Sequence, residues 1–425
     1  MPNALLVYPV FPPSYWGLTY ALKFVEKKAL MPPLGLLTVA SMFSQEWELR
    51  VTDMNVRALA DDDLQWADLV CVSAMVVQKK SMQEVIQRCH AIGVPVVAGG
   101  PYPTSYVDEI KGVDYFVLDE AEDTFADFLT AFENGTAAHV TRAPIKLDAR
   151  GNPVLDIRKM PMRLTPDVRR TPLPRYDLVN LDDYGCMALQ FSRGCPFDCE
   201  FCDITKLFGR IPRTKLSEQI IAELDLLYGL RWRGLVFMVD DNFIGNKKEA
   251  MRVLPAIAEW QRARNYPFSL FTEASVNLVE IDGLIDAMVA AGFEMVFLGI
   301  ETPNPEALLI TKKGQNVKAS EENYLLRAVR TIQAKGMEVS AGFILGLDGD
   351  TADAFDSQID FIQKAGIPMA LVNMLTALKG TDLYHRLEQE GRLRGDSTTN
   401  SMDMMLNFVP ELNPQVLCNG FKRVI

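Results

Sequence analysis

Three closely spaced cysteines, Cys195, Cys199 and Cys202, follow the pattern C-x3-C-x2-C. Three thiolates on one short loop can bind three irons of a 4Fe–4S cubane, and no fourth cysteine lies nearby in the sequence. The remaining iron would keep an open position for a small molecule, whereas an electron-transfer ferredoxin needs all four ligands. The spacing therefore predicts an iron–sulfur cluster that does chemistry.

A structural zinc site or a set of free thiols is the alternative interpretation. Zinc sites close with four ligands, usually from a second pair of Cys or His residues. The three histidines (His90, His139 and His385) are scattered along the chain, and none is spaced to complete such a site. The missing fourth ligand favours the cluster.

Carboxylates recur where the strands expected after the cysteines end. Asp240 and Asp241 end one strand, Glu273 ends the next and Glu301 the one after. In a parallel barrel the carboxyl ends of the strands carry the active site, so we expect these acids to face one cavity. Helix capping also places acids here, but their recurrence at successive strands favours a binding site.

These groups need a scaffold of alternating strands and helices, and the second half of the chain has that pattern. Six strand–helix units predict a partial parallel (β/α)6 barrel over residues 186–392. The strands are expected at 187–192, 235–240, 269–275, 295–300, 339–345 and 370–375. The helices are expected at 217–228, 247–264, 283–291, 321–334, 352–364 and 383–390.

Residues 1–135 show the same alternation with a shorter repeat. This pattern predicts an α/β domain with a doubly wound parallel sheet, of the Rossmann-like kind. Gly99-Gly100-Pro101 ends one strand, where a ligand could approach the backbone, although a plain turn is the favoured interpretation. The strands are expected at 4–10, 48–53, 68–74, 95–98 and 115–118, and the helices at 34–43, 81–92 and 121–133.

Two segments do not fit the alternation. Repeated prolines in residues 136–185 predict a linker between the domains. Residues 393–425 are polar and then weakly helical, and they predict a C-terminal extension. This extension stops without a helix-ending signal, so we expect a truncated or partly ordered end, which further residues could complete.

Composition narrows the classes of partner. The 425 residues carry a formal net charge of −12, which disfavours a nucleic acid as the main partner. No apolar run approaches the ~20 residues that cross a bilayer, and the N-terminus does not resemble a signal peptide. Seven cysteines without an export signal suggest reduced thiols or metal ligands. We therefore predict a cytoplasmic protein that acts on a small molecule.

The cysteine loop after the first barrel strand, with Phe201 before its third cysteine, resembles that of the radical S-adenosylmethionine superfamily. The resemblance implies an enzyme in which S-adenosylmethionine chelates the open iron and an external reductant, such as flavodoxin or ferredoxin, supplies one electron. The stretch 342–347 is similar to the family's glycine-containing strand beside adenine, and Arg193 could hold a carboxylate or brace the loop. The implied cofactor-binding residues are Arg193, Phe201, Asp240, Asp241, Glu273, Glu301, Gly342 and Gly346. The sequence assigns no general base or radical relay.

Over nearly its whole length the chain is similar to the branch that carries a cobalamin-binding-type domain, including at residues 31–37. Members of that branch include hopanoid C-methylases and a radical enzyme of arsinothricin biosynthesis. Domains that bind cobalt through histidine carry D-x-H-x-x-G, whereas residues 53–58 here read Asp-Met-Asn-Val-Arg-Ala. Cobalamin binding therefore stays open, with a domain that only packs against the barrel as the alternative.

Three functions compete. The first is alkyl transfer from S-adenosylmethionine to a small acceptor without cobalamin, most concretely of the 3-amino-3-carboxypropyl group to trivalent arsenic in arsinothricin biosynthesis. Cys418 could contribute a thiolate to such an acceptor. The second is cobalamin-dependent methylation of an unactivated carbon in a hopanoid-like lipid or another natural product. The third is a non-catalytic cluster protein that senses redox state or binds a partner. We expect a transferase of the first kind, with the second as its alternative.

Overall fold

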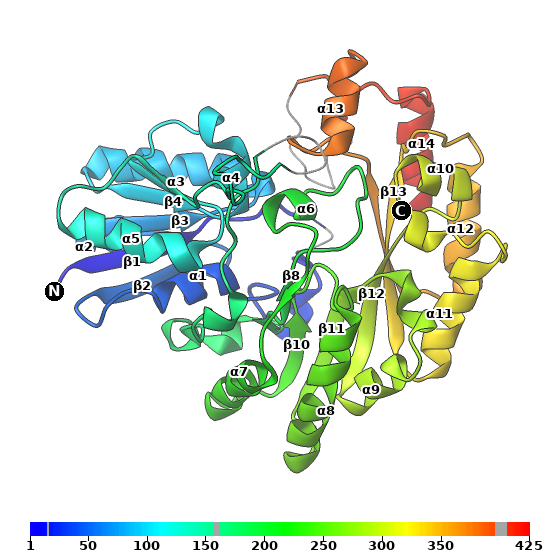
Figure 1. Ribbon diagram of the computed structural model, residues 1–425, viewed down its shortest axis with the longest axis horizontal. Helices are drawn as coiled ribbons and strands as arrows, with labels where there is room; N and C mark the ends of the chain where they lie inside the picture. Colours follow the sequence, from blue (N-terminus) through cyan, green and yellow to red (C-terminus); the bar gives the residue numbers. More distant parts are fainter. Residues whose placement is uncertain (15–16, 156–160, 396–405) are drawn as a thin grey trace. The chain divides into compact units, whose positions relative to one another are not determined.

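The computed structural model describes residues 1–14, 17–155, 161–395 and 406–425 (Figure 1). Its contacts divide the described residues into two units, the first of residues 1–12 and 22–184, the second of residues 13–21 and 185–425. Each unit contains its own six-stranded sheet. The predicted linker and C-terminal extension each include residues outside the described ranges.

The first unit is built on a sheet in which every paired strand is parallel. Its order is β2-β1-β3-β4-β5-β6, so the chain changes direction across the sheet between β1 and β3. Ligands of doubly wound folds bind outside the carboxyl ends of strands at such a point. The strands are β1 (Asn3–Tyr8), β2 (Glu48–Asp53), β3 (Leu69–Ser73), β4 (Val96–Gly99), β5 (Tyr115–Leu118) and β6 (Val140–Arg142).

Alternating side chains of β1 reach two separate cores, one on each face of this sheet. Leu5 and Val7 belong to the core that also holds residues of α2 (Asp61–Trp66) and α3 (Lys79–Ile92). Ala4 and Leu6 belong to the core with residues of α1 (Leu34–Ala40) and α5 (Ala121–Glu133). A parallel strand covered on both faces is apolar throughout, as β1 is. The predicted doubly wound domain is confirmed.

The predicted elements of this unit differ from the structure in the short ones. β6 lies in the predicted linker and extends the sheet by pairing with β5. The helices α2 and α4 (Pro101–Tyr106) were not predicted. Each of these elements is too short to show a sequence period, so only tertiary pairing reveals it.

The second unit holds the partial barrel that the sequence predicts. All neighbouring strands pair in parallel in the order β14-β13-β12-β11-β10-β7. The strands are β7 (Met187–Leu189), β10 (Gly234–Met238), β11 (Phe268–Ala274), β12 (Phe293–Glu301), β13 (Glu338–Leu345) and β14 (Met369–Met374). The helices are α6 (Ile204–Leu207), α7 (Ser217–Gly229), α8 (Lys247–Ala263), α9 (Leu284–Ala290), α10 (Pro305–Ile310), α11 (Tyr324–Ala334), α12 (Ala354–Ala365), α13 (Asp382–Gln389) and α14 (Pro414–Val424).

The first barrel strand ends earlier than the sequence predicts. β7 stops at Leu189, and the chain then forms β8 (Ser192–Arg193), which pairs antiparallel with β9 (Arg213–Thr214). The carboxylate of Asp240 causes this departure, because it accepts the backbone N–H groups of Phe191 and Ser192. The hairpin closes the loop that carries the three cysteines.

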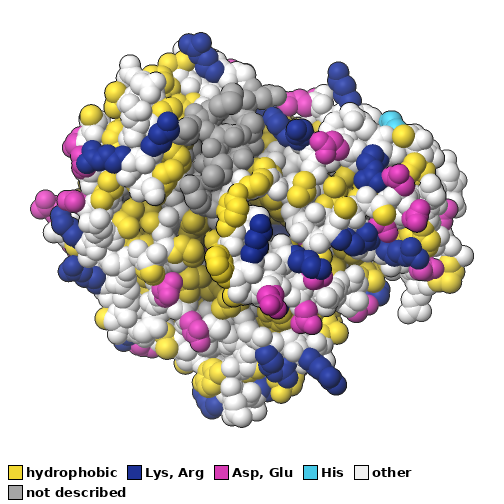
Figure 2. Space-filling model, turned by 180° about the vertical axis from the view of Figure 1, so that it is seen from behind, with side chains coloured by type: hydrophobic (Ala, Val, Ile, Leu, Met, Phe, Trp, Pro, Cys, Tyr) yellow, Lys and Arg dark blue, Asp and Glu magenta, His cyan; other side chains and the backbone are white. Residues whose placement is uncertain are grey.

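The surface of the described residues is mixed in charge. On the face drawn in Figure 2, Lys and Arg side chains are interspersed with Asp and Glu and form no continuous basic area among the described residues. Within the part of the chain that the structure describes, no helix combines the length and the apolarity that crossing a membrane requires.

Candidate active site

The cysteine loop between β8 and β9 is fixed at both ends. Gly194, at φ +95°, occupies a backbone region that favours glycine, and its N–H donates to Asp241 Oδ2 at 3.0 Å. The N–H of Cys195 donates to the Gly209 carbonyl at 3.3 Å. The loop is therefore anchored to the end of β10 before its first cysteine.

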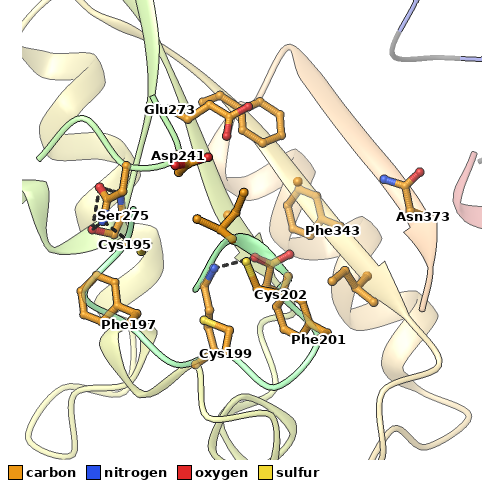
Figure 3. Close-up of a pocket in the computed structure, with 18 of the residues that line it drawn as sticks. Cys195, Phe197, Cys199, Phe201, Cys202, Asp241, Glu273, Ser275, Phe343 and Asn373 are labelled. Atoms are coloured by element: carbon orange, nitrogen blue, oxygen red, sulfur yellow. Dashed lines mark hydrogen bonds and ion pairs between the residues drawn. The ribbon is translucent and has the colours of Figure 1, made fainter. Parts of the chain in front are cut away.

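The three cysteines line one pocket of about 430 Å³ (Figure 3). Each is partly exposed and carries a free thiol. Among the described residues, no group of three or more His, Cys, Asp or Glu side chains converges closely enough to hold a single metal ion. Three thiols around one pocket without a single-ion site fit a polynuclear cluster, whose irons lie at separate corners, better than zinc.

Side-chain amides accompany two of the sulfurs. Asn242 Nδ2 lies 3.8 Å from Cys195 Sγ, and Gln315 Nε2 lies 3.4 Å from Cys199 Sγ. Hydrogen bonds to ligand sulfurs tune the potential of an iron–sulfur cluster. Burial raises the pKa of the Cys195 and Cys202 thiols, so metal binding must displace their protons.

Three of the predicted acids, Asp241, Glu273 and Glu301, line the same pocket. Burial is the main cause that raises the pKa of Asp241, to about 6. Burial, followed by the charges of Asp241 and Glu301, raises the pKa of Glu273 to about 7. Figure 3 shows Asp241 and Glu273 nearer the top of the view than the cysteines. A cation placed between them would be stabilised by both carboxylates.

Glu301 ends β12 in a distorted backbone. Its φ of +64° is rare for a residue with a side chain, and the pairing of β12 with β13 shifts register there. Asn316 Nδ2 donates to the Gly299 and Ile300 carbonyls at 2.9 and 3.0 Å, which supports the distorted turn. Strained backbone held by its surroundings is common at functional sites.

The distorted turn brings Glu301 to a buried lysine. Lys313 Nζ lies 2.7 Å from Glu301 Oε1, and both side chains are largely buried. Burial lowers the pKa of Lys313, but the charge and hydrogen bond of Glu301, together with the charges of Cys199 and Cys202, outweigh burial and hold that pKa above its ordinary value. The pocket beside the cysteines therefore contains a permanent cation.

Asp240, by contrast, does not line the pocket. It is 1% exposed, and its carboxylate holds the start of the cysteine loop through Phe191 N–H at 3.1 Å and the Ser192 hydroxyl at 2.5 Å. Burial is the main cause that raises its pKa to about 7. The structure therefore gives Asp240 a positioning contact and gives Asp241 the contact with the pocket.

The remaining predicted residues divide in the same way. Phe201 and Gly342 line the pocket, and a Cβ on Gly342 would lie 3.1 Å from the Phe297 ring. Gly346 instead packs against Leu417 of α14 at φ +87°. Arg193 donates from Nε to Gln190 Oε1 at 2.7 Å and is not among the pocket residues.

Several pocket residues were missed by the sequence analysis. Lys313 and Gln315 lie in the loop after α10. They were missed because the sequence Lys-Lys-Gly-Gln is typical of an exposed turn. Asn242 directly follows the predicted acids, but an amide carries no spacing signal of its own. Only the fold brings these residues to the cysteines.

The pocket fits the groups that the resemblance implies. The three thiols would hold a 4Fe–4S cluster, and Asp241 and Glu273 would hold the positive groups of S-adenosylmethionine. Lys313 offers a counter-charge for its carboxylate. The apolar surfaces of Phe297, Phe343 and Ile344 would pack against an adenine ring.

In the first unit, the carboxyl ends of the strands offer no cobalt ligand at the expected position. Asn55 stands where histidine-ligating domains carry histidine, and its Nδ2 donates to Asp53 Oδ1 at 2.7 Å. Its Oδ1 accepts the Phe11 N–H at 2.8 Å. A cobalamin bound here would be held without a bond from Asn55 to cobalt.

Packing explains Gly99, the last residue of β4, and Gly100, which follows it. A Cβ on Gly99 would lie 2.8 Å from the Val117 carbonyl oxygen, and one on Gly100 would lie 2.3 Å from Ser73 Oγ. Gly100 also has φ +90°, a value that favours glycine. The tripeptide Gly99-Gly100-Pro101 therefore does not by itself indicate a ligand, which agrees with the plain-turn interpretation.

Comparison with protein families assigns separate families to the N-terminal α/β domain and to the partial barrel. Residues 189–362 match the radical SAM superfamily, and residues 25–129 match the B12 binding domain. Residues 381–425 match a domain of unknown function, DUF4070. A solved structure of the radical S-adenosylmethionine methyltransferase TsrM from Kitasatospora setae, with cobalamin and a [4Fe-4S] cluster bound, has the same fold. Its TM-score is 0.69 at 19% identity, over 99% of this chain and 85% of that one.

Curated relatives extend the match to nearly the whole sequence. An uncharacterised methyltransferase of Synechocystis is 45% identical over 422 residues, which are 99% of this chain and 74% of the relative. The hopanoid C-2 methylase of Rhodopseudomonas palustris is 36% identical over 404 residues, which are 95% of this chain and 73% of the relative. The chain therefore belongs to the radical S-adenosylmethionine family, in the branch that carries a B12-binding domain and includes a hopanoid C-2 methylase. It is an enzyme of the transferase class, and its family uses a 4Fe–4S cluster and S-adenosylmethionine.

Proposed function

We propose that this enzyme uses cobalamin and S-adenosylmethionine to methylate an unactivated carbon of an apolar acceptor, such as a hopanoid-like lipid or another natural product. The observation that carries the proposal is a pocket that combines three cysteines, a pair of carboxylates and a buried lysine in a chain with a B12-binding domain. The identity to a hopanoid C-2 methylase supports the choice of acceptor class.

The roles of the chain's own residues follow from the geometry. Cys195, Cys199 and Cys202 would bind the cluster, which supplies the electron that cleaves S-adenosylmethionine. Asp241 and Glu273 would bind and orient the cofactor's cationic end. Phenylalanine side chains on the pocket wall would exclude water from a reactive carbon radical.

Transfer of an aminocarboxypropyl group to arsenic loses its support. That hypothesis needed thiolates for the acceptor, and Cys418 lies on α14 and is not among the residues that line the pocket. The family comparisons favour methyl transfer, which was the alternative. The structure gives the non-catalytic hypothesis no support either.

The electron must come from outside the chain, and we propose a flavodoxin or ferredoxin as its source. Each of these proteins transfers single electrons at low potential. A cytoplasmic setting suits such a partner, and all seven cysteines are free thiols.

Methyl transfer can be tested with S-adenosylmethionine that carries a deuterated methyl group. The enzyme is reconstituted anaerobically with cluster, with and without cobalamin, and incubated with a reductant and a hopanoid. A labelled methylhopanoid that forms only with cobalamin supports the proposal. Label transfer that does not depend on cobalamin would contradict it, and a panel of other apolar natural products separates the wrong acceptor from the wrong reaction.

A further inference from the structure

Glu200, between the second and third cysteines, makes a contact that the proposed chemistry does not use. It is 4% exposed, and Arg386 of α13 binds its carboxylate at two points. Arg386 Nη2 lies 2.7 Å from Glu200 Oε1, and Arg386 Nε lies 3.2 Å from Glu200 Oε2. A two-point arginine–carboxylate contact fixes orientation as well as distance.

The same arginine also binds the loop after β13. Arg386 Nη1 lies 2.7 Å from Asp348 Oδ2, and Asp348 receives a second, two-point contact from Arg392 at 2.7 and 3.0 Å. The loop that carries the cysteines and the loop after β13 are thus joined through two arginines of the C-terminal segment.

Backbone contacts reinforce this connection. Leu383 donates its N–H to the Glu200 carbonyl at 2.8 Å, and Glu200 donates its own N–H to the Thr311 carbonyl at 3.0 Å. Asp382, at the start of α13, lies 3.3 Å from Lys206 Nζ and 3.0 Å from Lys312 Nζ. The backbone between Cys199 and Cys202 is therefore hydrogen-bonded on both sides.

Apolar packing completes the contact. Phe201 packs against a buried cluster to which α13 contributes Leu383 and Leu387 and the following segment contributes Phe408. Two adjacent residues of the cysteine loop, one charged and one aromatic, are thus both held by the C-terminal segment (α13 is orange in Figure 1).

We propose that α13 is a clamp on the cysteine loop, and that the C-terminal domain of unknown function acts here to keep the iron–sulfur cluster in place. A buried carboxylate without its partner is costly, so loss of Arg386 should destabilise this conformation of the loop. Glu200, Arg386, Asp348 and Arg392 are positioning residues. The inference rests on the cluster of the proposed function, and it does not depend on cobalamin or the acceptor.

The first test measures iron loss from the anaerobically reconstituted holoenzyme to an Fe(II) chelator. Arg386→Met should release iron at least roughly tenfold faster than the unmodified enzyme, because the loss of even one of its charge-assisted hydrogen bonds is expected to change the rate by about that factor. Arg386→Lys, which keeps the charge but loses the two-point contact, should give an intermediate rate. Arg423→Met is the matched control, because Arg423 lies in the same C-terminal segment and pairs with Asp356, outside the clamp. It should leave the rate unchanged.

The second test needs no cluster. In the apoprotein, hydrogen exchange at the Glu200 and Leu383 amides should be roughly tenfold faster in Arg386→Met, while amides of β11 and β12 keep their rates. Glu200→Gln removes the charge of the carboxylate with little change in side-chain shape. If Arg386→Met does not fold, both tests can be made with Glu200→Gln instead. Glu200→Gln should also accelerate both processes.

Equal iron-release and exchange rates in Glu200→Gln and the unmodified enzyme would overturn the clamp. The same conclusion would follow if Arg423→Met accelerated iron loss as much as Arg386→Met, because the effect would then be general destabilisation. Failure of methyl transfer in the unmodified enzyme would instead count against the proposed function. The iron-release and hydrogen-exchange measurements would still test the clamp in that case, because neither requires methyl transfer.

Discussion

The two parallel sheets of this protein use their carboxyl edges differently. In the second unit, Asp241, Glu273 and Glu301 turn ionisable side chains into a pocket that also contains three thiols. In the first unit, Asp53 and Asn55 bind each other and nearby backbone groups. Although both sheets are parallel, ionisable side chains line a pocket at the carboxyl edge of the second sheet, whereas the polar side chains at the carboxyl edge of the first sheet are hydrogen-bonded to each other and to the backbone. Fold alone therefore does not tell where reactive groups will gather.

The largest expected effect concerns the cysteines of the second unit. Cys199→Ala should reduce reductive cleavage of S-adenosylmethionine by roughly 10³-fold or more, because the cluster loses a ligand. The formation of 5′-deoxyadenosine measures the loss of cleavage, and iron content with the electron paramagnetic resonance signal of the reduced cluster measures the loss of the cluster. Cys71→Ala, a buried cysteine of the first unit, is the control and should keep the iron. Equal loss in both variants would contradict the assignment.

The next effect concerns the buried ion pair. Lys313→Met leaves Glu301 buried without its partner, so the free energy of unfolding should fall by about 3 kcal/mol. Denaturant titration of the apoprotein measures this change. The double variant Lys313→Met/Glu301→Gln should recover much of the loss, because no uncompensated charge remains. No recovery would show that packing, rather than charge, dominates at this position.

The carboxylates of the pocket predict opposite effects of pH on stability and on binding. Their folded-state pKa values, about 6 for Asp241 and about 7 for Glu273, lie above the ordinary values of 3.8 and 4.5. The folded apoprotein holds these protons more tightly than the unfolded chain does, so its stability should fall as pH rises from about 4 to about 7. Binding of S-adenosylmethionine should instead tighten roughly tenfold over the upper part of this range, as the carboxylates ionise.

Isothermal titration with S-adenosylmethionine against pH checks the binding half of this prediction. Glu273→Gln should weaken binding and flatten the pH dependence. Asp53→Asn, at the edge of the first sheet, should leave both unchanged. If Glu273→Gln bound the cofactor with the unmodified pH profile, the carboxylate would not be part of its site.

The smallest expected effect concerns the first unit and is the absence of a spectroscopic signal from a protein ligand to cobalt. Cobalamin bound to the enzyme should show, in its Co(II) electron paramagnetic resonance spectrum, no coupling to a protein nitrogen, because Asn55 replaces the ligating histidine and its amide is held by Asp53 and Phe11. Uniform ¹⁵N labelling of the protein should therefore leave the spectrum unchanged. A spectrum that changed with labelling would show a protein nitrogen on cobalt and would reverse the contrast between the two edges.

The sequence predicted the parts of the fold whose signal is local or periodic. Glu48–Asp53, Tyr115–Leu118 and Ala121–Glu133 have the same bounds in the structure as in the prediction, since each is a run with a clear strand or helix period. β6 and the break after Leu189 escaped prediction, because a pairing partner and the Asp240 carboxylate determine them.

The residues of the site could likewise be predicted where the signal is local and could not where it depends on the fold. Cysteine spacing is a property of one loop, so Cys195, Cys199 and Cys202, which line one pocket in the structure, could be grouped without the fold. The meeting of Glu301 with Lys313 depends on a distorted strand end and on the turn after α10, which no window of sequence contains. Gly346 was predicted to contact the cofactor because residues 342–347 resemble the family's glycine-containing strand. In the structure it packs against Leu417, which lies on a helix far along the chain.

The most direct test of the account is mass analysis of what S-adenosylmethionine becomes in the reduced, cobalamin-loaded enzyme with an acceptor. Methyl transfer leaves S-adenosylhomocysteine, and reductive cleavage at the ribose carbon leaves 5′-deoxyadenosine. The account predicts both products, and it predicts that S-adenosylhomocysteine disappears when cobalamin is omitted. Methylthioadenosine as the main product would show that the aminocarboxypropyl group is transferred instead and would contradict the account.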